Sequence, residues 1–83
     1  MNVHIRLTEP FWRAIGSRNI VLELKEQASI SDLLDLLCQR YPVLGSEFEQ
    51  IQPMIFIGDD QVGSKDMLAE DDHVHLVWAV AGG

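Results

Sequence analysis

Two stretches in the first third of the chain carry an apolar residue at every second position. These are NVHIRL (residues 2–7) and NIVLELK (residues 19–25). A period of two is typical of a strand with one buried face. In the segment between them, Pro10 is suited to open a short helical turn and Gly16 to close it. The pattern therefore predicts two antiparallel strands joined by a short helical turn.

The next segment, SISDLLDLLCQRYP (residues 29–42), has the spacing of an amphipathic helix. Its apolar residues recur three and four positions apart and form one stripe, made of Ile30, Leu33, Leu34, Leu37, Cys38 and Tyr41. Ser29 and Asp32 have the S-x-x-D spacing of a capping box at the start of this helix. Pro42 disfavours helical backbone at the residue before it, so we expect the helix to end at Tyr41.

The second half of the chain predicts shorter elements. In order, they are a connector at 43–52 with a helical turn near 47–50, a strand at 53–57, a turn at 58–60, a brief return strand at 61–63 and a last strand at 73–80. The loop before the last strand is polar apart from Met67 and Leu68, which we expect to fill the core.

The order of these elements predicts the fold class. One helix cannot cover both faces of such a sheet, so it must pack on one face in an α+β arrangement. The first and last strands both carry alternating core residues, so we expect both in the middle of the sheet. We therefore predict a single domain over residues 1–83 with the β-grasp (ubiquitin-like) fold, a mixed sheet of four to five strands and one main helix.

Size and charge narrow the classes of function. The chain has 83 residues, with 6 Lys and Arg against 13 Asp and Glu, and a net charge of −7. A chain this short builds one modest core, which favours a carrier, a binding module or a subunit over a two-lobed enzyme. The acidic balance argues against contacts with nucleic acid. It fits docking on a basic protein partner.

The sequence also indicates a location. The start, MNVHIRLTEP, lacks the basic and apolar regions of a signal peptide. The longest apolar run, residues 76–81, is far too short for a membrane span. A lone cysteine, Cys38, is compatible with a reducing compartment. We expect a cytoplasmic protein with no membrane partner.

The end of the chain, MLAEDDHVHLVWAVAGG, resembles the closing signature of the MoaD/ThiS family of ubiquitin-like sulfur carriers. The family signature has a leucine, an acidic turn, a DxVxL strand and a terminal V-A-G-G, matched here by Leu68, Asp72, Val74, Leu76, Val80, Ala81, Gly82 and Gly83. The helix ending in Tyr41-Pro42 and the segment FWRAIGSRNIVLEL are also similar to that family. The fuller loop after the first strand makes the chain most like the small subunit of molybdopterin synthase.

The resemblance implies a function for the last residues. The carboxylate of Gly83 would become an acyl-adenylate and then a thiocarboxylate, which donates sulfur to a pterin precursor in molybdenum cofactor biosynthesis. Residues 79–83 would form a flexible tail in which Gly82 gives access and Ala81 and Val80 line the partner's channel. A tail without side chains suits a narrow channel because glycine tolerates backbone conformations that a Cβ forbids.

The resemblance also implies partners. They are the larger catalytic subunit of molybdopterin synthase, an ATP-dependent adenylating enzyme and a sulfur donor. The chain itself would bind no cofactor, since ATP is used by the adenylating enzyme, and on its own it would not be an enzyme. Three alternatives stay open. The chain could carry sulfur for thiamin, another thio-cofactor or tRNA thiolation, modify proteins through an isopeptide at Gly83, or be a β-grasp binding module with incidental glycines.

Three histidines form a further candidate site. His4 lies opposite the core residues of the first strand, and His73 and His75 lie opposite those of the last strand. We expect all three to gather on the open face of the sheet. We interpret them as a polar, partner-facing patch whose charge changes near pH 6–7. A three-histidine metal site is the less favoured interpretation.

The aromatic residues and the cysteine allow two readings each. Phe11 and Trp12 either form a small core beneath their loop or join Trp78 as anchors of a partner interface. Cys38 lies on the apolar stripe of the main helix, which fits a small buried hydrophobic residue better than a reactive thiol.

Overall fold

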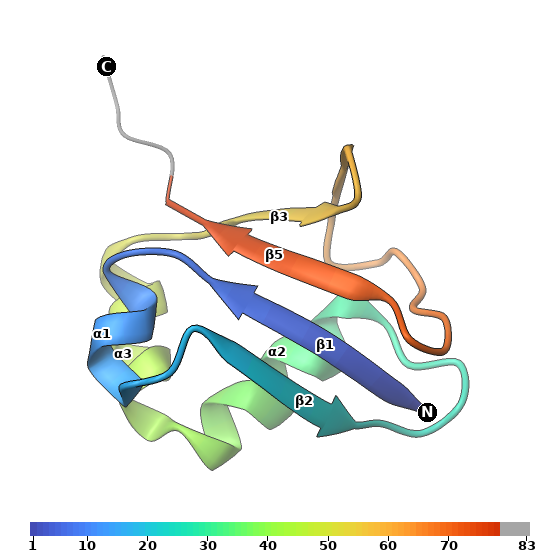
Figure 1. The fold of residues 1–83 in the computed structure, drawn as a ribbon, viewed down its shortest axis with the longest axis horizontal. Coiled ribbons are helices and arrows are strands. Elements are labelled where there is room, and N and C mark those ends of the chain that lie inside the picture. Colours follow the sequence, from blue (N-terminus) through green and yellow to red (C-terminus); the bar gives the residue numbers. More distant parts are fainter. Residues whose placement is uncertain (79–83) are drawn as a thin grey trace.

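The fold was obtained as a computed structural model, which describes residues 1–78 and contains five strands and three helices (Figure 1). In chain order the elements are β1 (Asn2–Leu7), α1 (Phe11–Ile15), β2 (Asn19–Glu23), α2 (Ile30–Arg40), α3 (Pro42–Gln50), β3 (Met54–Ile57), β4 (Asp60–Val62) and β5 (His73–Val77). None of the helices within residues 1–78 has the length and apolar character needed to cross a membrane.

All five strands form one sheet in the order β2-β1-β5-β3-β4. β1 is antiparallel to β2 and parallel to β5, while β3 is antiparallel to both β5 and β4. The first and last strands are therefore the central ones, which confirms the prediction. This mixed five-stranded sheet with its helices on one side is a β-grasp fold.

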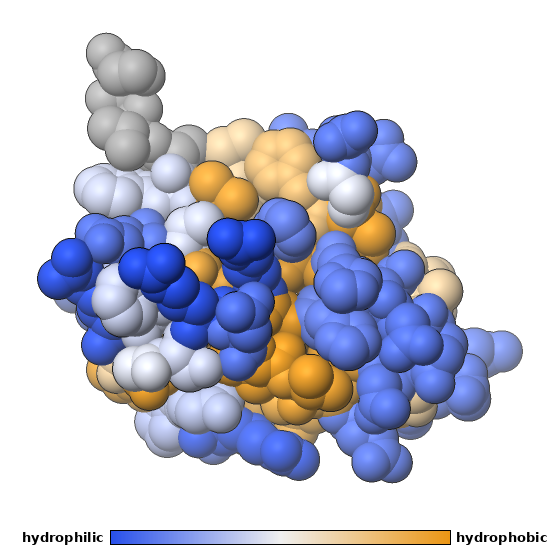
Figure 2. All heavy atoms as spheres, viewed as in Figure 1, coloured by the Kyte–Doolittle hydropathy of each residue, from blue (hydrophilic) through white to orange (hydrophobic). Residues whose placement is uncertain are grey.

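The alternating pattern of the strands separates a packed face from an open one. The apolar side chains facing the helices are buried, namely Val3, Ile5, Leu7, Ile20, Leu22, Ile55, Val74 and Leu76. α2 crosses behind β1 and β2 and covers them with its own buried stripe, Ile30, Leu33 and Leu37 (Figure 1). The other face of the sheet carries no helix, and Figure 2 shows it as a mainly blue surface with an orange band over β2.

The start of α2 has the capping box that its sequence predicts. The backbone N–H of Asp32 donates to the hydroxyl of Ser29 at 3.2 Å, and the backbone N–H of Ser29 donates to the Asp32 carboxylate at 2.9 Å. These bonds satisfy donors that the first turn of a helix leaves open. The bond from the Ser29 backbone stabilises the ionised carboxylate and holds the pKa of Asp32 below its usual range, with help from the Ser29 hydroxyl.

The segment after Tyr41 differs from its prediction. We expected a connector with a short helical turn, whereas α3 begins at Pro42 and continues for nine residues. Proline is tolerated in the first turn because its missing N–H would have no partner there. Proline therefore ended one helix and started the next. Leu44, which is fully buried, fixes α3 against the core.

The loop before β5 contributes one core residue rather than two. Leu68 is buried, but Met67 is 57% exposed, so the prediction was wrong for Met67. The backbone explains the difference, because Met67 pairs with Ser29 in a single β-bridge and the N–H of Leu68 donates to the carbonyl of Ala28 at 2.9 Å. In such extended backbone, neighbouring side chains point to opposite sides.

Candidate functional site

The C-terminal end of β5 is held by both neighbouring strands, β1 and β3. Leu76 pairs with Leu7 of β1, and Val77 pairs with Met54 of β3. The carbonyl of Leu76 accepts bonds from the backbone N–H of Thr8 at 3.2 Å and from its hydroxyl at 3.0 Å. Trp78, which is 40% exposed, therefore follows a strand end that is fixed in position.

The residues predicted to carry the chemistry come next in the chain. Val80, Ala81, Gly82 and Gly83 lie outside the described residues. Their roles, which the family resemblance implies, stay predictions. What the structure provides is the anchored strand from which they continue.

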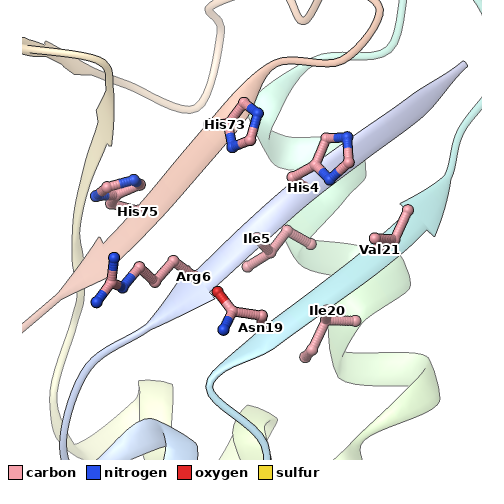
Figure 3. A pocket seen from close by; sticks show the side chains of 8 residues that line it. All are labelled: His4, Ile5, Arg6, Asn19, Ile20, Val21, His73 and His75. Atoms are coloured by element: carbon pink, nitrogen blue, oxygen red, sulfur yellow. The ribbon is translucent and has the colours of Figure 1, made fainter.

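The three histidines gather on the open face of the sheet, as expected (Figure 3). His4 of β1 is opposite His73 of β5, and Arg6 is opposite His75 one step further along. The rings of His4 and His73 stack, with centroids 4.6 Å apart and planes 8° from parallel. The predicted grouping of the three histidines on the open face is therefore present in the structure, and Arg6 lies beside them.

These side chains border a shallow depression of about 320 Å³ on the open face. The rest of its border is formed by Ile5, Arg6, Asn19, Ile20 and Val21 (Figure 3). The Nε2 atom of His4 lies 3.3 Å from a carboxylate oxygen of Asp71, in the turn before β5. The depression therefore offers hydrogen-bonding groups beside a small apolar surface, a combination suited to protein contacts.

The geometry of the histidines bears on the metal interpretation. Within residues 1–78, no three His, Cys, Asp or Glu side chains converge as a group that could hold a metal ion. The His4 and His73 rings lie face to face, so their nitrogens point sideways rather than at a common point. A tetrahedral site needs its ligand atoms aimed at one centre. The arrangement favours the interpretation as a polar, partner-facing patch.

The two neighbouring aromatic residues of α1 have different environments. Phe11 is fully buried and packs edge-on against Phe48 of α3, with ring centroids 5.2 Å apart. It is therefore a core residue, and its assignment to a partner interface was wrong because its ring never reaches the surface. Trp12 is half-buried and Trp78 is exposed, so both remain candidates for contact with a partner.

The side chains around Trp12 were not singled out from the sequence. The guanidinium of Arg18 lies over its ring at 4.5 Å from the centroid, and that of Arg13 lies at 5.3 Å. Alternation along β1 puts Arg6 on the same face as His4, but the approach of Arg18 to Trp12 depends on how the loop after α1 folds back. The available signal was the presence of Arg13 and Arg18 one and six positions after Trp12.

Cys38 is partly buried on α2, where its Cβ and Sγ lie close to Gly45 of α3. Burial raises the pKa of the Cys38 thiol, and the negative charge of Asp35 raises it further. Reactive cysteines instead have lowered pKa values. The environment of Cys38 therefore fits a packing residue rather than a sulfur-handling one.

Comparison with known proteins gives the family. The sequence model of the ThiS family matches residues 5–83. The chain belongs to the ThiS family. Members of this family are small ubiquitin-like carriers that are not catalysts themselves, which agrees with a site built around an anchored strand end. No curated protein matches the sequence.

Solved structures agree with the fold. SAMP1 from Haloferax volcanii, a small archaeal modifier protein, superposes with a TM-score of 0.88 at 20% identity, with both chains fully covered. A chain from the complex of subunits 1 and 2 of the molybdopterin-converting factor of Helicobacter pylori gives 0.69 at 21% identity, again over both whole chains. A chain from the BexX/CysO complex of Amycolatopsis orientalis gives 0.76 at 19% identity, over 98% of this chain and 99% of that one. At these identities the similarity shows the β-grasp fold.

Proposed function

We propose that this ThiS-family chain is a sulfur carrier that serves as the small subunit of a molybdopterin synthase, with Gly83 as the carrier residue. The observation that carries the proposal is the family match, which extends through the Gly-Gly end to residue 83. The anchoring of β5 supports it, because a central strand gives the residues that follow a rigid base. In this proposal the partner enzymes bind the folded domain, and residues 79–83 form the reacting tail.

The proposed chemistry takes place entirely at the Gly83 carboxylate. A carboxylate is a poor electrophile, so the adenylating enzyme first joins it to the α-phosphorus of ATP and pyrophosphate leaves. A persulfide of the sulfur donor then attacks the acyl carbon, and AMP leaves. Reductive cleavage of the resulting acyl disulfide by a thiol yields the thiocarboxylate. This chain supplies no general acid or base to these steps.

The length of the tail matches this role. Five residues, 79–83, span at most roughly 16–18 Å when extended. That reach is sufficient to bring Gly83 from a docked surface into a buried catalytic pocket. The small side chains of Val80 and Ala81 and the absence of side chains at Gly82 and Gly83 suit a narrow entrance.

Two partners follow from the proposal. The larger synthase subunit would accept the thiocarboxylate, and the adenylating enzyme would regenerate it. The solved complexes of β-grasp relatives with subunit 2 of the molybdopterin-converting factor and with BexX support the expectation that such a chain works inside a complex. The histidine patch, Trp12 and Trp78 are our candidates for contacts in those complexes.

The decisive experiment is an intact-mass measurement. The purified chain is incubated with ATP, the adenylating enzyme from the same genome and a sulfur donor. We expect a mass change equal to the exchange of one oxygen for one sulfur, and no change when ATP is omitted. A chain whose mass stays unchanged under these conditions would contradict the carrier proposal.

The pathway is tested in a second step. The thiocarboxylated chain is mixed with the larger synthase subunit and a pterin precursor, and we expect the chain to return to its carboxylate mass as the precursor is consumed. Return of the mass only with a thiazole-forming or tRNA-thiolating enzyme would assign another pathway. Heavier conjugates at protein lysines, in place of sulfur exchange, would assign the modifier function.

A further inference from the structure

Three of the six basic residues of this acidic chain lie at the end of the sheet where β5 ends. We call Arg6, Arg13 and Arg18 the arginine cluster. Arg6 is on β1, Arg13 on α1, and the carbonyl of Arg18 accepts the backbone N–H of Leu7 at 2.8 Å. All three side chains are exposed. Figure 2 shows the deepest blue of this face where β1 leads into α1.

Carboxylates are sparse on the open face around this cluster. The side chains of the five strands that face away from the core are Asn2, His4, Arg6, Asn19, Val21, Glu23, Met54, Phe56, Gln61, His73, His75 and Val77. Glu23 is the one acidic residue among them, and it lies opposite Asn2, at the far end of β1 from the cluster. The sign of charge at this end is therefore opposite to that of the whole chain.

Arg6 and Arg18 border a second depression, of about 250 Å³, between the end of β1 and α1. Its remaining border is formed by Leu7, Thr8, Glu9 and Trp12. Thr8 is also the residue whose N–H and hydroxyl bind the carbonyl of Leu76. The depression therefore lies directly beside the C-terminal end of β5.

Only part of the arginine cluster is neutralised within the described chain. A guanidinium nitrogen of Arg13 is 2.9 Å from a carboxylate oxygen of Glu9, four residues earlier on the same loop and helix. Within residues 1–78, neither Arg6 nor Arg18 forms an ion pair. Glu9 thus occupies Arg13 and leaves the other two guanidinium groups to bind an external anion.

The Trp12 ring favours such a contact by Arg18, whose guanidinium carbon lies over the ring, 4.5 Å from its centroid. A guanidinium over an aromatic face is held there by a cation–π interaction, and its planar fork presents N–H donors along its edge. Those edge donors match a carboxylate in a two-bond arrangement. Because the contact with Trp12 restricts the rotation of the Arg18 side chain, a bond made by Arg18 costs less entropy than one made by a freely rotating arginine.

We infer that Arg6 and Arg18, with Trp12, bind an acidic side chain at the rim of the adenylating enzyme that receives the tail. The inference rests on the proposed function. A chain of net charge −7 would otherwise dock best on a basic surface. The arginine cluster reverses the preference for a basic surface at one end of the sheet. An acidic rim would therefore attract the end where β5 ends and repel the rest of the surface. This difference would orient the carrier before its tail enters the adenylating enzyme.

The test is a kinetic comparison of charge-reversed variants. Pyrophosphate release by the adenylating enzyme is measured against the concentration of the full-length chain. For the double variant Arg6→Glu and Arg18→Glu, we expect KM for the chain to rise by at least about tenfold with kcat nearly unchanged. Arg18→Lys keeps the charge but not the fork of donors, and we expect an intermediate KM.

A matched control is provided by Lys25→Glu with Lys65→Glu. This double variant changes the net charge equally. Lys25 follows β2 at the other end of the sheet (Figure 1). Lys65 lies in the loop after β4, where the carbonyls of Ser64 and Asp66 accept backbone bonds from the start of α2. We expect a change in KM of less than about twofold. We also expect kcat/KM of the wild type, but not of the arginine variant, to fall between about 0.05 and 0.5 M NaCl, since salt screens exposed charges.

The outcomes separate the two proposals. An equal loss in both double variants would show an effect of total charge and overturn the assignment of the arginine cluster, as would an unchanged KM in both. Thermal unfolding of each variant shows whether any loss comes from misfolding. If the charge-reversed variant is misfolded, Arg18→Lys, which preserves the charge, tests the assignment in its place, and an unchanged KM for Arg18→Lys would overturn it. If the wild-type chain is never adenylated, the proposed function fails instead.

Discussion

Cys38 illustrates how packing between two helices sets the chemistry of one residue. Its thiol lies against Gly45, and burial together with the charge of Asp35 raises its pKa. At about pH 8, near the ordinary cysteine pKa, less thiolate is present than in an unfolded chain. We expect the folded protein to react with iodoacetamide more slowly than the same protein in urea, by intact mass. Faster alkylation of the folded form would contradict the packing role.

At the other end of the chain, Gly83 is the residue on which the proposed function depends. We expect deletion of Gly83 to abolish sulfur incorporation, because the reacting carboxylate would then lie one residue short of the catalytic pocket. Gly83→Ala adds a Cβ where the channel is proposed to be narrow, and we expect a similar loss. Incorporation is measured by intact mass and the fold by circular dichroism. Normal sulfur incorporation by either variant would refute the assignment.

The face on which a side chain lies was predictable from the sequence where apolar and polar residues alternate regularly. Alternation placed His4, His73 and His75 on one face, and the structure brings them together there. No period constrained Phe11, which two readings allowed, or Met67, which the sequence placed wrongly. The direction of a loop side chain depends on contacts distant in the sequence, such as the bridge between Ser29 and Met67.

Among the elements, α2 owes its defined start to the capping box. Removing the hydroxyl in Ser29→Ala leaves the N–H of Asp32 without its partner. The expected loss is about 1 kcal/mol in the free energy of unfolding, the usual cost of replacing a serine cap by alanine. Urea unfolding followed by circular dichroism measures it, and Ser31→Ala, two residues later and exposed, is the control.

The same capping box makes part of the stability depend on pH. The pKa of Asp32 is lowered from 3.8, so its ionised form stabilises the folded chain above that value. This contribution is lost as the pH falls through the lower folded value. We expect Asp32→Asn to be less stable than the wild type at neutral pH, with a difference that shrinks below pH 3.8. A constant difference across this range would mean that the charge of Asp32 plays no part.

The short helix α1 has one fully buried side chain, Phe11. Phe11 is fully buried against Phe48, so Phe11→Ala would leave a cavity between α1 and α3. Such substitutions cost about 3–5 kcal/mol, a large share of the total stability of a small domain. Urea unfolding measures the loss. Val21→Ala, at a position 56% exposed, should change the stability by less than about 0.5 kcal/mol.

Elements with a strong period were predicted well, and those without one were not. α2 ended near Tyr41 as its stripe and Pro42 indicated. α3 was underestimated because its apolar residues are few and because Pro42, which stops one helix, is equally good in the first turn of another. The last strand ends at Val77 in the structure, earlier than the apolar run suggested, while residues 79 and 80 lie outside the described part.

At the scale of the whole molecule, the order of elements predicted the β-grasp fold and its central pair of strands. Composition did not predict how charge is distributed over the surface. A net charge of −7 is a sum over the whole chain, and it gave no sign that arginines from β1, α1 and the loop before β2 meet at one end. That meeting depends on the hairpin register and on the turn at Gly16, whose φ of 76° lets the chain reverse after α1.

The position of β5 between β1 and β3 has a mechanical consequence. A partner that grips the tail and pulls would load β5 along its own length. The hydrogen bonds to both neighbours lie across the strand, so they would resist together in shear rather than open one at a time from an edge. The carrier can thus be withdrawn from a tight channel by its last residues while the sheet stays intact, whereas an edge strand in the same place would have hydrogen bonds to one neighbour only.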